Sequence, residues 1–281
     1  MRVTIVIDST VDARPAVRER CTVVPLPVRF GDKEYIDGVT IDRKTFYEML
    51  VESDTLPTTS QPTPDAFADA FRKAVDSGNE VVVLTLSSKL SGTCQSANIA
   101  AMDFPGKVYV VDTGTVAIGS GILAERAVEL AQQGLDAKTI AGILTAERDK
   151  IRVVAMLDTL EYLKKGGRIS KTVAFAGELL AIKPVVSVQD GEIVMLGKAR
   201  GSKQANNLLV KEIENAGGVD FSKPVLLGYT GLSDLLLKKY IADSAALWEE
   251  NGSEPDSVLI GSVIGTHAGP GAVAAAFFSK N

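Results

Sequence analysis

Short apolar runs alternate with helix-length segments through the first half of the chain, and this alternation limits the fold more than any other feature. Four segments are mostly unbroken apolar runs: residues 3–7, 22–28, 80–86 and 107–111. Such runs are typical of strands in a parallel sheet that is covered on both faces, whereas a half-exposed strand alternates apolar and polar residues. The sequence therefore predicts an α/β fold whose first half is a mostly parallel, doubly wound sheet.

The segments between these strands carry signals for helix starts. Asp42 is a suitable N-cap for a helix that runs to Ser53. Thr63 followed by Pro64 is an N-cap with proline at the first helical position, and it predicts a helix to about Ser77. Further helices are predicted over residues 93–101, 116–133 and 136–150.

The second half of the chain has a different pattern. Asp190-Gly191 lies between two apolar runs and predicts a β-hairpin with strands over residues 185–188 and 192–196. Further strands are predicted over residues 151–156, 225–229 and 257–264, and helices over residues 160–164, 202–215 and 233–250. This mixture predicts a mixed or antiparallel sheet with helices. We therefore expect two α/β domains, residues 1–155 and 156–281.

Composition and charge exclude several classes of protein. Hydrophobic residues make up 46% of the chain and charged residues 23%, which is the balance of a globular protein. The formal net charge is -5 and the basic residues are scattered, so a nucleic-acid partner is not expected. The first apolar run reaches Asp8 too early for a signal peptide, and no segment approaches the roughly 18 apolar residues of a membrane span. Cys21 and Cys94 form neither a metal spacing nor a disulfide framework. A cytoplasmic location is the expectation.

His267 is the only histidine, so any imidazole chemistry must use it. The sequence predicts that it follows a strand and precedes a Gly-Pro-Gly turn that opens a helix. A lone histidine is more often a hydrogen-bonded structural residue than a ligand-binding one. One imidazole with many neutral hydroxyls makes a poor metal site and an incomplete acid–base pair. The same groups suit a small anion such as a carboxylate, which would favour the protonated imidazole.

Two hydroxyl-rich turns are candidate partners for His267, residues 58–64 and 87–93. Prolines at positions 57, 62 and 64 stiffen the first turn, although an ordinary loop with a helix cap explains it equally well. The second turn follows a strand and opens a helix, where unpaired N–H groups attract an anion. Capping alone would also explain its serines.

Other chemistries fit the sequence less well. A Ser-His-Asp hydrolase would have to use His267, and the chain has no G-x-S-x-G motif. Cys94 at a helix start could be an activated thiolate, but a packed thiol is the simpler interpretation. The run Asp8-Ser9-Thr10 is similar to an aspartyl-phosphate site, yet the second aspartate is missing and an Asx-type cap is favoured.

Six motifs, in order along the whole chain, resemble those of the DegV family of bacterial fatty-acid-binding proteins, which includes the FakB subunits of fatty acid kinase. The motifs lie at residues 8–10, 59–64, 86–93, 160–170, 182–185 and 265–271. Six motifs in one order are far more specific than any single motif.

The resemblance implies a two-domain carrier that holds one long-chain fatty acid, such as palmitate or oleate, between its domains. It implies no catalytic residue, metal or cofactor. Carried over residue by residue, it assigns the carboxylate end to the two hydroxyl-rich turns and the late histidine. The implied fatty-acid-binding residues are Thr59, Ser60, Ser91, Gly92, Thr93 and His267.

In the kinase-linked members of the family, a separate ATP-dependent subunit phosphorylates the carboxylate to an acyl phosphate. The resemblance therefore also implies a role in phospholipid metabolism, transient contact with a membrane, and docking of that subunit by Arg168 and Arg200. Cys94 departs from the family pattern, because many members have an aromatic residue at this position. The resemblance therefore does not fix the shape of the pocket near Cys94.

Three functions remain open at this stage. The first is a lipid-binding module that presents a fatty acid to an enzyme. The second is an acyl hydrolase or transferase using Ser91 or Cys94 with His267, and the third is a protein–protein regulator with lipid as a filler. Burying about fifteen methylenes at ~0.8 kcal/mol each gives roughly 12 kcal/mol before the costs of association. Hydroxyls and one imidazole would compensate the buried carboxylate, so the first function is favoured.

Overall fold

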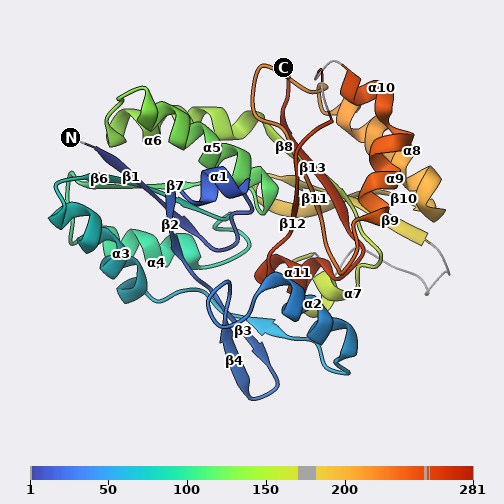
Figure 1. The fold of residues 1–281 in the computed structure, drawn as a ribbon, viewed down its shortest axis with the longest axis horizontal. Helices are drawn as coiled ribbons and strands as arrows, with labels where there is room; N and C mark the ends of the chain where they lie inside the picture. Colours follow the sequence, from blue (N-terminus) through green and yellow to red (C-terminus); the bar gives the residue numbers. More distant parts are fainter. Residues whose placement is uncertain (1, 170–181, 250–251, 253, 281) are drawn as a thin grey trace.

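The first half of the chain forms an all-parallel sheet with the strand order β2-β1-β6-β7 (Figure 1). The computed structural model describes residues 2–169, 182–249, 252 and 254–280. The four strands are β1 (Val3–Asp8), β2 (Cys21–Val24), β6 (Glu80–Thr85) and β7 (Val108–Asp112). β1 and β6 are almost wholly buried, as their unbroken apolar sequences predict. The prediction of a parallel, doubly wound sheet is confirmed.

Helices cover both faces of this sheet. α3 (Pro64–Asp76) and α4 (Thr93–Ala101) pack on the face that carries Val6 and Val83. α1 (Pro15–Arg18), α5 (Ile118–Gln132) and α6 (Ala137–Glu147) pack on the opposite face, and the 3-10 turn η1 (Arg148–Lys150) follows α6. The predicted caps are present, because Asp42 accepts a hydrogen bond from Thr45 N and begins α2 (Arg43–Glu52), and Thr63 begins α3.

The strand predicted over residues 22–28 is in fact two strands in two sheets. Pro25 and Pro27 lack the N–H groups that a continuous ladder needs, and the chain turns away after β2. β3 (Pro27–Phe30) instead pairs with β4 (Lys33–Ile36) and β5 (Thr58–Thr59) in a small antiparallel sheet. This small sheet and α2 lie below the main body in Figure 1, beside helices of the second half.

The second half forms a mixed sheet, as predicted, with the strand order β10-β9-β8-β13-β11-β12. Only β11 and β12 are parallel, and the other neighbours are antiparallel. The strands are β8 (Ile151–Met156), β9 (Ile182–Gln189), β10 (Glu192–Arg200), β11 (Leu226–Tyr229), β12 (Ser257–Leu259) and β13 (Val273–Phe278). The predicted hairpin is β9–β10, and Asp190 and Gly191 at its turn both have positive φ.

α8 (Gly201–Asn215) and α9 (Leu235–Asp243) cover the outer face of the mixed sheet. The domain boundary between residues 155 and 156 falls within β8 and stays a prediction. Ser170 of the fourth motif and Glu250, the expected end of the last helix, lie outside the described residues.

Three expectations for the second half were wrong. The helix predicted over residues 233–250 is divided into α9 and α10 (Ala245–Trp248) at Ser244, whose backbone leaves the helical region with φ -116° and ψ 20°. The strand predicted over residues 257–264 ends at Leu259, and α11 (Ser262–Ala268) follows. The helix expected after the Gly-Pro-Gly turn is β13, since pairing with β8 and β11 on its two sides overrides the helix propensity of its alanines.

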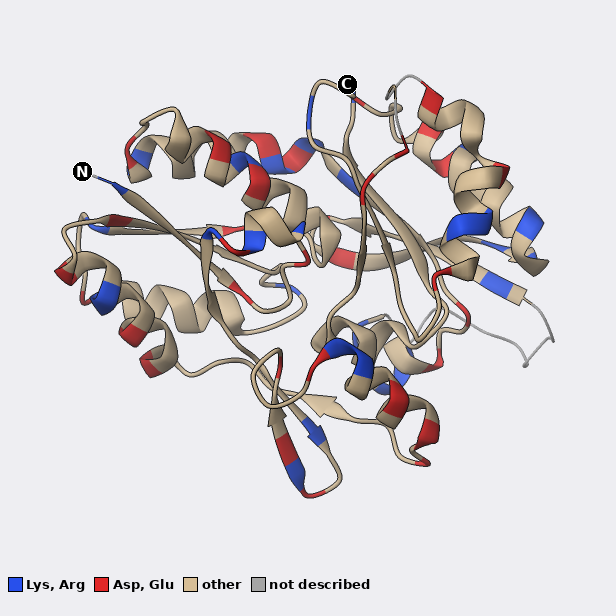
Figure 2. Ribbon diagram, in the orientation of Figure 1, with Lys and Arg blue, Asp and Glu red and all other residues tan. Residues whose placement is uncertain are grey.

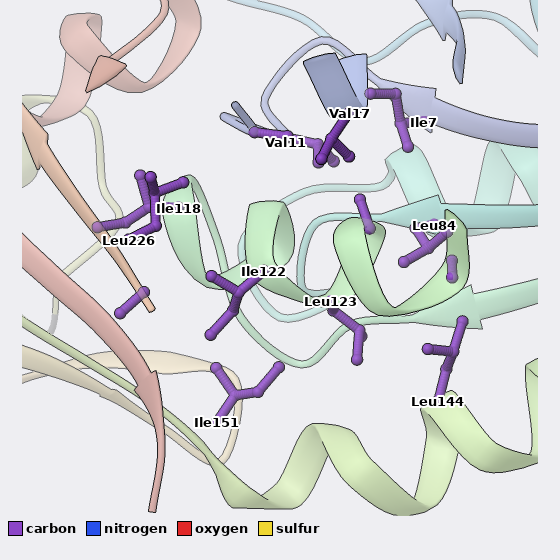
Figure 3. Packing of buried hydrophobic residues seen from close by; sticks show 14 of the residues in the cluster. Ile7, Val11, Val17, Leu84, Ile118, Ile122, Leu123, Leu144, Ile151 and Leu226 are labelled. Atoms are coloured by element: carbon purple, nitrogen blue, oxygen red, sulfur yellow. The ribbon is translucent and has the colours of Figure 1, made fainter. Parts of the chain in front are cut away.

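Helix α5 lies between the two main sheets and contacts both. Its contacts include β1 and β6 on one side and β8, β11 and β13 on the other. Figure 3 shows Ile118 and Ile122 of α5 on the side of Leu226 and Ile151, and the same cluster includes Ile7 of β1 and Leu84 of β6. The two sheets therefore share one hydrophobic core around this helix.

Asp8 ties the end of β1 to the segment after β6. Its buried carboxylate accepts hydrogen bonds from Thr10 N at 2.8 Å, from the Thr10 hydroxyl at 2.5 Å and from Leu86 N at 2.8 Å. Burial raises the pKa of Asp8 to about 6, although these three bonds oppose the shift. The Asx-type cap predicted for Asp8-Ser9-Thr10 is confirmed. The carboxylate also fixes the carboxyl ends of the two central strands, β1 and β6, relative to each other.

Replacing Asp8 by Ala is expected to lower the free energy of unfolding by about 2–4 kcal/mol, because buried donors at Thr10 and Leu86 lose their acceptor. Urea unfolding of the lipid-free protein measures this change. Asp136→Ala is the matched control, because Asp136 caps α6 at the surface and its loss costs about 0.5–2 kcal/mol. A smaller effect at Asp8 than at Asp136 would contradict the structural role of the buried carboxylate.

Candidate functional site

A mostly apolar cavity of about 350 Å³ lies between the two main sheets. The cavity lies beyond the carboxyl ends of β1 and β6, the two central strands of the parallel sheet. From this pair the sheet continues to β2 on one side and to β7 on the other. Ligands of open α/β sheets bind at this kind of switch point. The apolar walls include Leu86, Leu90, Val116, Ile118, Val153, Ala155, Val186, Ile260, Val263, Ile264 and Ala274. The cavity lies within the size range of small-molecule sites.

Several polar residues that line the cavity come from four separate segments. The first turn contributes Thr59, Ser60 and Gln61, and the second contributes Ser91 and Gly92. Arg168 follows α7 (Glu161–Lys165), and His267 comes from α11. The fold therefore brings together the two hydroxyl-rich turns and the single histidine, which are far apart in the sequence. We call the cavity lining formed by Thr59, Ser60, Gln61, Ser91, Gly92, Arg168 and His267 the polar end.

His267 lies in the last turn of α11, and this corrects the expectation that it stands at a helix N-terminus. The local sequence resembles a helix start because glycines surround it, but the Gly-Pro-Gly turn ends one helix and leads into β13. The imidazole Nε2 is 2.9 Å from the Thr59 hydroxyl oxygen, and Nδ1 is buried without a hydrogen-bond partner among the described residues. Burial, with a smaller contribution from the positive charge of Arg168, lowers the pKa of His267 to about 4, so the imidazole is neutral at pH 7.

The Gly-Gly-Arg motif makes room for this imidazole and turns Arg168 toward the cavity. A Cβ atom on Gly166 would lie 2.3 Å from His267 Nδ1, so only glycine permits this approach. Gly167 has φ +69°, a backbone conformation that favours glycine. The Arg168 guanidinium then donates to Leu90 O at 3.2 Å and to Gly166 O at 2.5 Å. Arg200, in contrast, is exposed at the end of β10 and does not line the cavity.

The turn after β6 is held by its own hydroxyls. The Ser91 and Thr93 hydroxyl oxygens are 2.9 Å apart, and Thr93 is buried behind Ser91, away from the cavity lining. A Cβ atom on Gly92 would lie 2.0 Å from Gln61 Oε1, so this glycine lets the two turns meet. Gln61 was not among the expected binding residues. Its place in the Thr-Ser-Gln-Pro motif was the available signal, and its amide donates to the Ser96 hydroxyl at 3.0 Å.

The described residues do not pair His267 with Ser91 or Cys94, as the acyl hydrolase or transferase alternative requires. His267 is bonded to Thr59, whereas Ser91 is bonded to Thr93. Cys94 is buried and does not line the cavity, and burial raises the pKa of its thiol. The departure at Cys94 therefore does not change the cavity lining directly.

The part of the chain that the structure describes contains no group of three or more His, Cys, Asp or Glu side chains placed to hold a metal ion. Within the same residues, none of the helices combines the length and the apolar character that crossing a bilayer requires. Figure 2 shows both signs of charge interspersed over the elements.

Comparison with known proteins gives one consistent result. The model of the family described as "Uncharacterised protein, DegV family COG1307" matches residues 2–280. A DegV domain-containing protein of Deinococcus radiodurans is 36% identical over 282 residues, which cover 98% of each chain. A solved structure of a DegV family protein from Thermus thermophilus, described by its fatty acid binding, is 33% identical with a TM-score of 0.85, covering 99% of this chain and 100% of that one. A stearic-acid-binding protein from Eubacterium ventriosum is 28% identical with a TM-score of 0.85, covering 99% and 98%.

The titration of His267 can be followed directly by proton NMR, because it is the only imidazole in the chain. We expect a midpoint near pH 4 in the lipid-free protein. In the unfolded chain the pKa of a histidine is about 6.5, so the unfolded state takes up the proton first as the pH falls. The stability that depends on neutral His267 is therefore fully present above pH 6.5 and is lost as the pH falls to 4.

At about 1.4 kcal/mol per pKa unit, this loss is at most about 3.5 kcal/mol. His267→Gln is the control, since it should lack this part of the pH dependence of the free energy of unfolding. A midpoint near 6.5 in the folded protein would show that the ring is not held in a desolvated position.

Proposed function

This chain belongs to the DegV family, and on that premise we propose that it binds one long-chain fatty acid in the cavity between its sheets. The observation that carries the proposal is the distribution of polarity within one cavity. The polar end gathers hydroxyls, an imidazole and a guanidinium, whereas most of the remaining lining is aliphatic. This distribution matches a molecule with one carboxylate and a long hydrocarbon tail.

The hydrocarbon tail supplies most of the binding free energy. Each methylene that leaves water for the aliphatic walls contributes ~0.8 kcal/mol before association costs. Ala155 lies in a central strand of the mixed sheet and is nevertheless only half-buried, because the cavity leaves its methyl group uncovered. A chain lying over Ala155 and Ala274 would complete the packing of this face of the sheet.

The carboxylate is compensated at the polar end. A buried carboxylate without partners would cancel much of the gain from the tail. Hydroxyls of Thr59 and Ser91 are hydrogen-bond donors, and Arg168 supplies a positive charge at the cavity lining. His267 is neutral in the lipid-free cavity, and a carboxylate beside it would raise its pKa.

The proposal includes presentation of the carboxylate to an ATP-dependent kinase subunit. Ser60 and Gln61 are exposed, and Arg168 and His267 are half-buried, so the polar end is close to the surface. A partner enzyme could reach the carboxylate there without withdrawing the tail. Arg200 is exposed outside the cavity and is the residue we propose for docking. His267 pairs with Thr59 and not with Ser91 or Cys94, which disfavours the acyl hydrolase or transferase built on those two residues.

The direct test is mass spectrometry of an organic extract of the purified protein, together with its native mass. We expect one free fatty acid per chain and stoichiometric uptake of palmitate or oleate after lipid removal. A protein that is empty and takes up neither acid would rule out the proposal. Release of a covalent acyl adduct from the chain would instead favour the hydrolase or transferase.

Replacing Thr59 or Ser91 by Ala should weaken oleate binding by about 1–3 kcal/mol, because a buried carboxylate oxygen loses a donor. Equilibrium titration of lipid-free protein with a fluorescent fatty acid, displaced by oleate, measures the dissociation constant. Thr145→Ala removes an exposed hydroxyl on α6 and should leave binding unchanged. If both cavity variants bind like the natural protein, the carboxylate lies elsewhere.

Arg168 and Arg200 can be separated by matched variants. Arg168→Met keeps the aliphatic stem but removes the charge from the cavity lining, and we expect at least a tenfold loss of oleate affinity. Arg200→Met should bind oleate normally, because Arg200 lies outside the cavity. Unchanged affinity in Arg168→Met would restrict Arg168 to docking, as the family resemblance alone implies.

A further inference from the structure

We infer that Asp12 and Arg43 are positioning residues for the polar end of the cavity. Neither side chain lines the cavity, but together they fix the start of α11, the helix that carries His267. The inference rests on the proposed function, because its consequence is a change in fatty-acid binding. Asp12 and Arg43 would not touch the ligand themselves; they would act by holding the residues of the polar end that do.

Asp12 belongs to the segment after β1 and reaches across to the second half of the chain. Its side chain is completely buried, and Oδ1 accepts hydrogen bonds from Gly261 N at 3.0 Å and from Arg43 Nη2 at 2.9 Å. Gly261 is the residue that precedes α11. One carboxylate oxygen from the first half therefore holds the first turn of the helix that ends at His267.

Arg43 holds the same segment from its other side. It is the first residue of α2, and its Nη1 donates to the carbonyl oxygen of Leu259, the last residue of β12. Between these two anchors lies Ile260, which lines the cavity and whose carbonyl accepts from the Tyr47 hydroxyl at 3.1 Å. The connection from β12 to α11 is thus bonded at three consecutive residues.

The middle of α11 leaves little room for independent movement. A Cβ atom on Gly265 would lie 2.6 Å from Tyr47 Oη and 2.8 Å from a ring carbon of Phe46, so α2 packs directly on the backbone of α11. Gly261 and His267 are six positions apart, which is about 9 Å along a helix. A tilt of ~10° at the start of α11 would move the imidazole by roughly 1.6 Å, enough to break the bond to Thr59.

The electrostatics also point to a positioning role. Asp12 Oδ2 has no hydrogen-bond partner among the described residues, and burial raises the pKa of Asp12 to about 6 despite Arg43 and Arg18. Asp37, also buried, adds a like charge nearby. A buried pair of this kind contributes little net stability compared with apolar packing. Its effect is to select one orientation of the segments that it joins, which is what a preorganised site requires.

The test compares Asp12→Asn, Arg43→Met and the double variant with a matched control, Arg14→Met. Arg14 also joins the two halves of the chain, through Asp256 and Val225 O, but these bonds do not go to α11. Three quantities are measured on lipid-free protein: the free energy of unfolding in urea, the dissociation constant for oleate, and the pKa of His267 by NMR.

We expect each single variant to lose roughly tenfold in oleate affinity and to shift the pKa of His267 from about 4 toward 6.5, because the imidazole leaves its desolvated position. The loss of affinity in the double variant should be smaller than the sum of the two single losses, since each single variant already removes the Asp12–Arg43 charge pair. Arg14→Met should lose stability without changing the affinity or the pKa of His267.

Natural affinity and an unchanged pKa of His267 in Asp12→Asn and Arg43→Met would overturn the inference and leave the pair with a structural role only. If Asp12→Asn does not fold, the half-buried Arg43→Met decides between the same outcomes. If the natural protein itself binds no oleate, the proposed function fails. In that case the pKa of His267 in the variants still shows whether the pair positions the imidazole.

Discussion

The sharing of one helix by two sheets is the constraint on which the rest of the structure depends. α5 packs against both sheets and holds them around a single core, and the residues at its start are bonded to the segments that follow β1 and β6. Val116, Ala117 and Ile118 therefore line a space that neither sheet fills by itself. Ala117 adopts a positive φ of 55° at this point, a strained conformation that persists only where its surroundings fix it. The cavity is a consequence of how α5 enters between the sheets.

The polar end of this cavity is assembled by close backbone approaches. Gly92 admits Gln61, Gly166 admits His267, and Gly265 admits Phe46 and Tyr47. Each of these glycines removes a Cβ atom that would hold two segments apart. Short polar side chains from segments far apart in the sequence can therefore converge without long flexible stems, which keeps the entropy cost of ordering them low. The hydrogen-bond donors of the polar end are therefore preorganised, because the packing of the chain fixes their positions before a ligand binds.

The buried charges of the protein hold backbone segments in place. Asp8 bonds the ends of β1 and β6, and Asp12 bonds the start of α11 with Arg43. Burial raises the pKa of both carboxyl groups, yet each remains occupied by N–H donors of the chain itself. Arg168, by contrast, lies at the lining of the cavity, and His267 beside it is neutral. This separation leaves the charge of Arg168 available to an anionic group at the polar end.

Local patterns in the sequence determined the elements that depend on local forces. The apolar runs of β1 and β6, the caps Asp42 and Thr63, and the Asp190-Gly191 turn were all predictable, because each acts through neighbours a few residues away. The hydroxyl turns and the histidine could likewise be chosen as candidates for an anion site from their chemistry.

Only the tertiary structure decided the elements that depend on distant partners. The alanine-rich β13 is a strand because β8 and β11 pair with it on both sides. His267 is at a helix C-terminus because the chain enters β13 directly after the Gly-Pro-Gly turn. The approach of Thr59 to His267 spans 208 residues, and the place of Arg168 at the cavity depends on Leu90 and Gly166. Such contacts follow from the packing of whole sheets and helices, and no short window of sequence contains the residues that fix them.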